Sequence, residues 1–185
     1  MKEFLKKHSA CEEGFKWAVE NCKTMQEVWD TAKPEWLTWL ATRPGVVTDR
    51  ELFEFALWSA QQVKHLMKDD RSKNALLVRR KWLDGEASNE EMNVAESAAR
   101  EAGSAAWSAP LDCSAAGRAA RLSAGSAAWA TDSADSVASA AESAAESARL
   151  AAGSASRSSQ ADWFRWNTKP NFERSAEDTK QETKL

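Results

Sequence analysis

The feature that most constrains the fold of this chain is a stretch of small residues that runs from about residue 95 to residue 161. Ala, Ser and Gly fill most of its positions, and nothing before Met92 resembles it. Alanine is the best helix former, whereas serine and glycine cost up to about 1 kcal/mol per residue relative to it. We therefore expect helices here that persist only when they pack on each other, on the rest of the chain or on a second chain.

Charged side chains argue against a membrane location for this stretch. They recur along its whole length: Arg100, Glu101, Arg118, Arg121, Asp132, Asp135, Glu142, Glu146 and Arg149. A membrane-spanning helix needs about 20 predominantly apolar residues. The N-terminus lacks the apolar core of a signal peptide, and three widely spaced cysteines are typical of reduced thiols. We therefore expect a soluble, cytoplasmic protein.

The net charge of −3, from 25 basic and 28 acidic residues, disfavours one class of partner. A protein that binds nucleic acid without sequence preference carries a strong excess of positive charge. We expect no non-specific nucleic-acid binding.

Helix start signals recur through the first half of the chain. Ser9, Thr24, Thr48 and Ser88 are each followed three residues later by Glu, which is the spacing of a capping box. Pro34 suits the first turn of a helix, and no segment alternates with a period of two beside hairpin turn residues. Apolar periodicity predicts helices over residues 10–21, 25–32, 34–42, 49–68, 73–84 and 89–109.

The small-residue stretch should divide into two or three long helices. Pro110 lacks a backbone donor and should end the first of them. A second helix is expected from about Asp112 to Ala130, and a third from Thr131 to about Trp166. The motif GSAAW occurs at Gly103–Trp107 and again at Gly125–Trp129. Small side chains at such positions let helix backbones approach closely.

The predicted fold class is therefore all-α. We expect an N-terminal helical lobe over residues 1–92 and an Ala/Ser-rich helical region over residues 93–166, packed closely against the lobe and within itself. Residues 167–185 are polar and carry few large apolar groups, so we expect a flexible tail there.

The chain carries little of the apparatus of catalysis. It has only two histidines, and no HExxH, paired CxxC, GxSxG or GxxxxGK[ST] motif occurs. Cys11 and Cys22 lack the further ligands of a zinc site, so we interpret them as buried reduced thiols. His65 has no carboxylate to orient it and is interpreted as a solvated residue at a helix end. We expect no enzymatic activity, no metal and no cofactor.

A basic group of side chains is the first candidate binding site. Lys64, Arg71, Arg79 and Arg80 surround the turn between two predicted helices. They could bind phosphate groups or an acidic partner. The alternative is a solvated surface that neighbouring aspartates partly neutralise.

An acidic stripe is the second candidate. Asp132, Asp135, Glu142 and Glu146 recur at helical spacing. They could meet a basic protein or mimic the phosphates of a nucleic acid. More often, such a stripe keeps a helix soluble.

The tryptophans form the third candidate, because the chain has ten Trp and no Tyr. Trp107 and Trp129 end the two GSAAW motifs, and Trp163 and Trp166 follow the small-residue stretch. These rings could contact a partner or stack on a nucleobase. Packing between helices is the commoner role of Trp at such positions.

Three segments of the chain resemble a family of immunity proteins found in bacterial and phage genomes. They are CEEGFKWAVENCKTMQEVWDTAKPEWLTWLATRPG, RRKWLDGEASNEEMNVAESAAREA and QADWFRW, and the resemblance covers about residues 3–166. Many relatives carry Tyr among their alanines, where this chain has Trp and Ser. The resemblance implies a non-enzymatic protein that binds and neutralises a toxin of a competing cell, or a defence-system component if the carrier is a phage.

Two other functions are compatible with the sequence. The chain could sequester an anionic nucleotide signal, with its phosphates at Lys64, Arg71, Arg79 or Arg80 and its base against a Trp ring. It could also be a structural, oligomerising helical protein. Because small-residue faces gain little until a large contact area closes around them, we expect a homo-oligomer.

Overall fold

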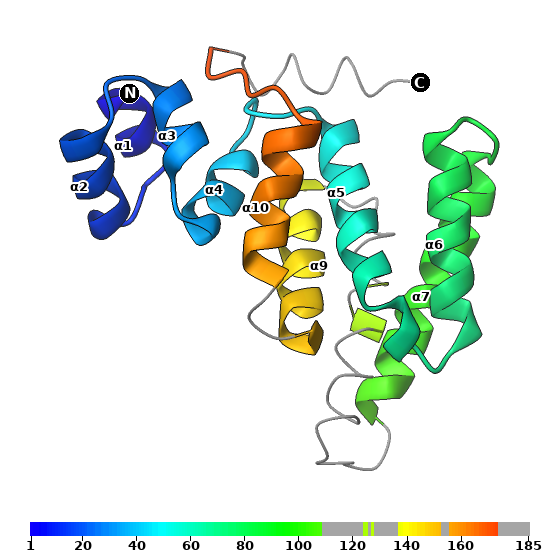
Figure 1. The fold of residues 1–185 in the computed structure, drawn as a ribbon. Coiled ribbons are helices and arrows are strands. Elements are labelled where there is room, and N and C mark those ends of the chain that lie inside the picture. Colours follow the sequence, from blue (N-terminus) through cyan, green and yellow to red (C-terminus); the bar gives the residue numbers. More distant parts are fainter. Residues whose placement is uncertain (109–123, 126, 128–136, 153–155, 174–185) are drawn as a thin grey trace. The chain divides into compact units, whose positions relative to one another are not determined.

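A computed structural model shows the all-α fold that the sequence predicts (Figure 1). The structure describes residues 1–108, 124–125, 127, 137–152 and 156–173, and these ranges contain no strand. The chain forms two compact units, one of residues 1–49 with 157–185 and one of residues 50–156. The predicted boundary near residue 92 lies within the second unit.

The first unit joins the start of the chain to its C-terminal helix. Its helices are α1 (Lys2–Lys7), α2 (Glu12–Asn21), α3 (Met25–Thr31), α4 (Pro34–Ala41) and α10 (Ser156–Asn167). Helices α2, α3 and α4 lie close to their predicted bounds, whereas α1 is not expected from the sequence. The sequence predicts one helix from Thr131 to Trp166, but the structure has α9 and α10 there, and they belong to different units.

The second unit contains the remaining described helices. They are α5 (Asp49–Gln62), the 3₁₀ helix η1 (Lys64–Leu66), α6 (Asp70–Leu83), α7 (Asn89–Ser108) and α9 (Val137–Ala152). The helix predicted over residues 49–68 is shorter, because its last turn is η1. Helix α6 begins earlier than predicted, because Asp69 caps it and accepts a 2.9 Å hydrogen bond from the Arg71 backbone N–H. The helix predicted from Asp112 to Ala130 lies almost entirely outside the described residues.

The capping boxes predicted at Thr24 and Ser88 form. Thr24 Oγ1 accepts a 3.1 Å hydrogen bond from Glu27 N at the start of α3, and Glu27 Oε2 accepts one of 2.6 Å from Lys23 N. At the start of α7, Glu91 N donates to Ser88 Oγ over 3.2 Å, while Ser88 N donates to Glu91 Oε2 over 2.8 Å. Each pair satisfies backbone N–H groups that the first turn of a helix leaves without partners.

The capping box predicted at Ser9 does not form, because another residue caps α2. The Cys11 sulfur accepts from Gly14 N over 3.4 Å and takes that role. Ser9 instead ends α1 with a positive φ of 56°. The hydrogen bonds Ser9 N to Lys6 O (3.1 Å) and Ala10 N to Leu5 O (2.9 Å) form a Schellman motif.

Helix α6 ends with the same motif around a glycine. Gly85 has a φ of 76°, and its N–H donates to Trp82 O over 3.1 Å. Glu86 N donates to Lys81 O over 2.7 Å. Glycine adopts this backbone conformation without the steric cost that a Cβ atom adds.

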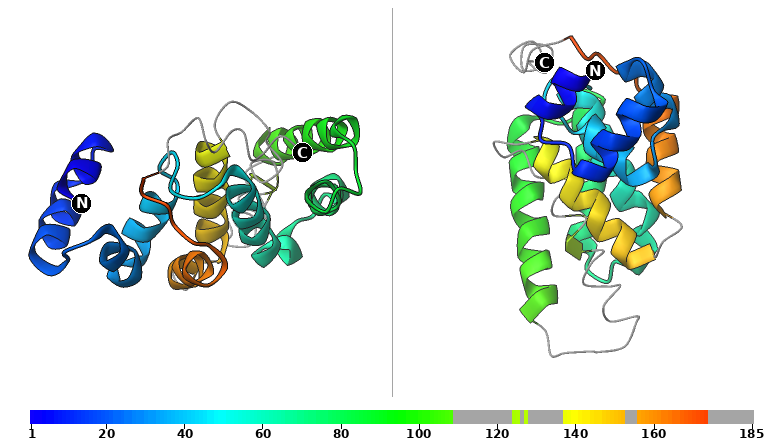
Figure 2. Two further views of the ribbon diagram at one scale, coloured as in Figure 1. Left: turned by 90° about the horizontal axis from the view of Figure 1, so that it is seen from above. Right: turned by 90° about the vertical axis from the view of Figure 1, so that its left-hand side faces the viewer.

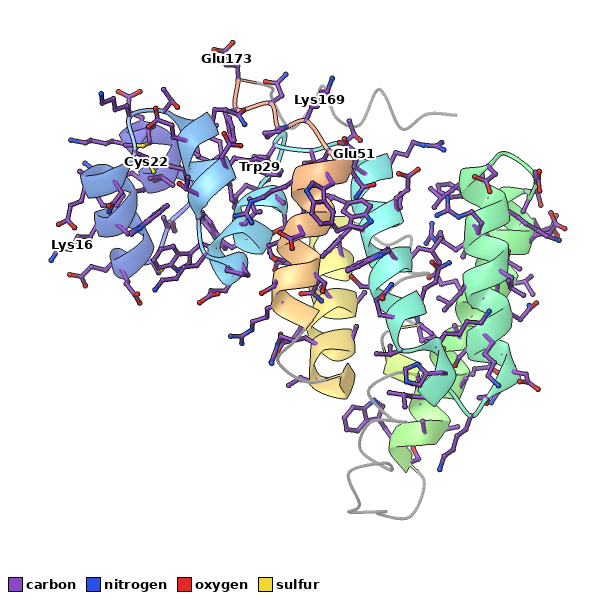
Figure 3. The ribbon with its side chains drawn as sticks, in the orientation of Figure 1. Lys16, Cys22, Trp29, Glu51, Lys169 and Glu173 are labelled. Atoms are coloured by element: carbon purple, nitrogen blue, oxygen red, sulfur yellow. The ribbon has the colours of Figure 1, made fainter. Side chains whose placement is uncertain are left out.

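The core of the first unit gathers around Trp29 of α3 (Figure 3). The Trp29 ring centroid lies 6.3 Å from that of Phe164 on α10 and 6.3 Å from that of Phe172, both in edge-on geometry. Phe172 also meets Phe4 at 5.7 Å, and Asn171 N donates to Val46 O over 2.8 Å. The start of the segment expected to be a flexible tail thus contacts the core of this unit through Phe172 and the Asn171 backbone; residues 174–185 lie outside the described ranges.

In the second unit, α6 and α7 form an antiparallel hairpin and contact each other, as Figure 1 and the view from above in Figure 2 show. Its core holds Ala75 of α6 with Met92, Ala95 and Ala99 of α7. Trp82 packs against this core, and its indole N–H donates to Asn89 Oδ1 over 2.7 Å. Small residues on the facing sides let the two helices approach closely.

Five alanines of the small-residue stretch are buried on one face of α9. They are Ala140, Ala141, Ala144, Ala145 and Ala148. A Cβ atom at Gly125 would lie 3.9 Å from Ser147 Oγ and 3.9 Å from Trp107 Nε1. Both α7 and α9 therefore come close to Gly125, the first residue of the second GSAAW motif.

Candidate partner-binding surfaces

Three of the four predicted basic residues lie on the surface of the second unit. Arg71 is exposed at the start of α6, Arg80 is exposed near its end, and Lys64 is half-buried on η1. Arg71 Nη2 lies 2.8 Å from Asp69 Oδ2 and Nη1 lies 3.4 Å from Glu101 Oε2. Arg80 Nη1 lies 3.6 Å from Asp84 Oδ1. Carboxylates therefore already accompany both arginines.

The pair at the start of α6 also shifts the protonation of its members. Hydrogen bonds from the Arg71 side chain, and then from its backbone N–H, lower the pKa of Asp69. The same side-chain bond raises the pKa of Arg71. A phosphate group would have to compete with this carboxylate for the guanidinium.

Arg79 does not belong to the exposed group, because it is fully buried. Its guanidinium carbon lies 4.5 Å from the Phe53 ring centroid and 5.0 Å from that of Trp82. These two rings meet edge to face at 5.5 Å. An arginine held over aromatic faces gains cation–π stabilisation. Arg79 therefore has a place in the packing of α5 against α6, and the structure separates it from Arg71 and Arg80.

Half of the predicted acidic stripe lies outside the described residues, namely Asp132 and Asp135. Glu142 is half-buried and Glu146 exposed on α9. The Glu146 carboxylate pairs with the Arg149 guanidinium one turn further on, and this bond raises the pKa of Arg149. The described part of the stripe thus carries a compensating positive charge.

The tryptophans are placed differently from one another. Of those that the structure describes, Trp29 is buried, Trp107 and Trp166 are exposed, and the others are half-buried. Trp107 ends α7 with 60% of its surface exposed. Trp129, its counterpart in the second GSAAW motif, lies outside the described residues.

Trp166 is the more exposed of the two, at 81%, although its helix is firmly attached. Beside it in sequence, Phe164 is fully buried. Arg165 Nη2 donates to Ala32 O over 2.7 Å, and Arg165 Nε donates to Trp29 O over 3.4 Å. Helix α10 therefore presents a large apolar ring to solvent from a fixed backbone. The spacing from Phe164 marks Trp166 as lying off the buried face, a signal available in the sequence.

The described residues that were considered for metal binding or catalysis do not form a common site. The Cys11 thiol is exposed, which corrects its interpretation as buried, whereas Cys22 is buried and its sulfur lies 3.7 Å from Thr31 Oγ1. Cys113 lies outside the described residues, and His65 is exposed on η1. Within the described ranges, no three His, Cys, Asp or Glu side chains are placed to hold a metal ion.

No helix among the described residues has both the length and the apolar character needed to cross a bilayer. Comparison of the chain with protein-family models, with curated proteins and with solved structures finds no match. The membership of an immunity-protein family that the three sequence segments suggest stays a prediction.

Proposed function

We propose that this chain is a non-enzymatic binding protein of the immunity or anti-defence type, which neutralises a toxin or a defence component by occupying its surface. The observation that carries the proposal is Trp166, which is 81% exposed on a helix anchored by Phe164 and Arg165. Tryptophan is enriched among the residues that dominate binding energy at protein interfaces. A ring held on a fixed helix also loses little conformational freedom when it binds.

Trp107 supports the same proposal from the second unit. It is 60% exposed at the end of α7, and its Nε1 atom would lie 3.9 Å from a Cβ atom at Gly125. An exposed indole ring offers a partner a large apolar contact and a hydrogen-bond donor. Single exposed apolar residues are common on proteins, so the proposal depends on the effect of removing these rings.

The sequestration of a nucleotide signal has weaker support. Arg71 and Arg80 carry carboxylate partners, and Arg79 is buried in the packing of α5 and α6. Titration with a panel of cyclic and linear nucleotides in a calorimeter tests this alternative directly. Binding that persists in the Arg71→Ala variant would assign the phosphates elsewhere.

The main test is neutralisation in cells that carry a candidate toxin or defence system. Wild-type chain, Trp166→Ala and Trp107→Ala are compared with Leu150→Ala, which truncates a 50% exposed apolar side chain on α9. A residue central to an interface contributes about 2 kcal/mol or more, so we expect affinity for the purified partner to fall about thirtyfold in one of the Trp variants. The Leu150 variant should bind like the wild type.

Two controls make the result interpretable. Unfolding curves of the Trp variants should match that of the wild type, because both rings lie on the surface. The protein that co-purifies with the chain from these cells must be a toxin or defence component, and its activity must decrease when the chain binds it. The proposal fails if no tested background is protected, or if both Trp variants protect cells as well as wild type does.

A further inference from the structure

Helices α1 to α4 of the first unit surround an apolar cavity that the proposed function does not use. Its volume is about 160 Å³. Buried side chains of Leu5, Val28 and Leu40 line its inner part, and half-buried Trp17 and Trp36 line its sides. The exposed Cys11 thiol is also part of the lining and marks the side open to solvent.

The walls of this cavity are held in place by interactions outside it. The Trp17 and Trp36 ring centroids lie 5.3 Å apart with the planes tilted by 45°. Lys33 Nζ lies 4.5 Å from the Trp36 centroid and 3.1 Å from Glu13 Oε1 of α2. The cation therefore contacts the outside of the aromatic wall and pairs across the surface with α2.

Gly14 of α2 lies beside both Trp36 and Cys11 of the lining. A Cβ atom at Gly14 would lie 3.5 Å from Trp36 Cε2 and 3.2 Å from the Cys11 sulfur. The second of these distances is tighter than ordinary van der Waals contact, so a side chain here would displace the thiol. The absence of a side chain at residue 14 thus shapes the mouth of the cavity.

The lining restricts the charge of any occupant. Among the described residues, the lining contains no Asp, Glu, Lys, Arg or His, and its polar side-chain groups are those of Ser9, Cys11 and the indole N–H groups of the tryptophans. A charged ligand would lose its water without gaining an opposite charge, at a large cost in free energy. The occupant must therefore be neutral, with room for at most a small polar group near the Ser9 hydroxyl.

We propose that this cavity binds a small neutral molecule with a single aromatic ring. A dry apolar cavity of about 150 Å³ in another protein binds benzene, whereas pockets for drug-sized ligands begin at about 300 Å³. Aromatic rings pack favourably against each other in tilted arrangements, and Trp17 and Trp36 offer two such surfaces. Trp166 does not line the cavity, so this site is independent of the proposed partner surface.

Toluene and phenol are suitable neutral probes, with benzoate as the charged comparison. We expect both neutral probes to bind the full chain in a saturable way by calorimetry and to raise its melting temperature, while benzoate does neither. The nuclear magnetic resonance signals of the Trp17 and Trp36 indole N–H groups should shift as the neutral probes are added. Equal binding of benzoate would overturn the proposal, and so would the absence of saturable binding by either neutral probe.

Cavity-filling variants test the location of the site. Ala18 and Ala32 are buried alanines in the lining, on α2 and at the end of α3. Ala18→Leu and Ala32→Leu should each weaken toluene binding by about tenfold or more, equivalent to about 1.4 kcal/mol. The matched control is Ala105→Leu, the same change at an exposed position on α7, which should leave binding unchanged. Wild-type affinity in both lining variants would place the probe elsewhere.

The Cys11 thiol gives a second test, which uses the wild-type chain and needs no substitution. Its thiol lies in the lining but is exposed, so an occupied cavity should slow its alkylation. The reaction of the wild-type chain with iodoacetamide is followed by peptide mapping, which separates Cys11 from Cys22 and Cys113. We expect saturating toluene to slow Cys11 alkylation several-fold and to leave the buried Cys22 unaffected. An unchanged Cys11 rate would contradict the proposed occupancy.

Discussion

Arg165 and Ala32 are joined by a 2.7 Å hydrogen bond from the guanidinium Nη2 to the backbone carbonyl at the end of α3. The same guanidinium donates through Nε to Trp29 O over 3.4 Å. Both carbonyls belong to the last turn and cap of α3, where no later helical N–H is available to them. An arginine far along the chain thus completes the end of an early helix.

The first prediction concerns this contact. Arg165→Met should lower the free energy of unfolding by about 1–2 kcal/mol, because a charge-assisted hydrogen bond to a helix end is lost. Arg165→Lys should lose less, because it keeps one donor and the charge. Urea unfolding measures both changes. Arg157→Met, at an exposed position on the same helix, should remain within about 0.5 kcal/mol of wild type. An equal loss in the Arg157 variant would assign the effect to α10 in general.

The second prediction compares two adjacent arginines. Arg79 is buried over the rings of Phe53 and Trp82, whereas the Arg80 side chain is 44% exposed and pairs with Asp84. Arg79→Ala should destabilise the protein by about 2 kcal/mol or more, because a desolvated cation–π contact is lost and a space is left. Arg80→Ala should cost less than about 1 kcal/mol, the usual range for a surface ion pair. Thermal unfolding measures the loss of stability in each variant. Similar losses of stability in Arg79→Ala and Arg80→Ala would contradict the burial of Arg79.

The position of Arg79 on the buried face of α6 could be predicted from the sequence, but the side chains that surround it could not. Arg79 lies four residues after Ala75 and four before Leu83, so it shares the buried face of α6 with them. A charged side chain is nevertheless expected to be exposed to solvent unless a partner is known to lie close to it. The faces of Phe53 and Trp82 come from two different helices, and only the tertiary structure shows that they meet at this arginine.

Local signals predicted most helix boundaries, because the interactions that set them span few residues. Thr24 and Ser88 cap α3 and α7 through bonds to residues three positions away. The same signal failed at Ser9, because the short helix α1 recruited this residue into its own C-terminal turn. Two local motifs competed for one serine, and the sequence does not reveal which is the more stable.

The exposure of the tryptophans depended on information that local patterns do not contain. Trp107 and Trp29 both lie in predicted helices, yet the first is exposed and the second is buried. Burial of Trp29 requires Phe164 and Phe172, which come from the opposite end of the chain. The contacts of Phe172 were missed for the same reason, because this ring finds its apolar partners in α1 and α3.

The third prediction follows from the positive φ of Ser9. A residue with a Cβ atom is strained at φ 56°, so Ser9→Gly should raise the free energy of unfolding by about 0.5–1 kcal/mol. The reciprocal change is Gly85→Ala, at φ 76° with no atom near its Cβ position. It should lower stability by about 1 kcal/mol through backbone strain alone. Denaturant titration measures both, and a loss of stability in Ser9→Gly would mean that its side chain has a stabilising role.

The last prediction concerns His8, which is half-buried. The centroid of its ring lies 4.4 Å from that of the Phe4 ring. Burial lowers the pKa of His8 below 6.5, and the nearby charges of Lys7 and Arg43 act in the same direction. Just below pH 6.5 the unfolded chain therefore binds more protons than the folded one. The stability that comes from keeping His8 neutral is present above pH 6.5 and is lost as the pH falls toward the folded-state value.

Unfolding in urea at pH 7.5 and pH 5.5 measures this loss. The wild-type free energy of unfolding should be lower at pH 5.5, and His8→Gln should remove the part of the difference that this ring contributes. His65→Gln keeps His8 and should retain that part. The window lies above the range in which Asp69 and Glu91 titrate, since hydrogen bonds lower the pKa of both carboxyls. A ring titration midpoint for His8 at or above 6.5, measured by nuclear magnetic resonance in the folded protein, would refute the argument.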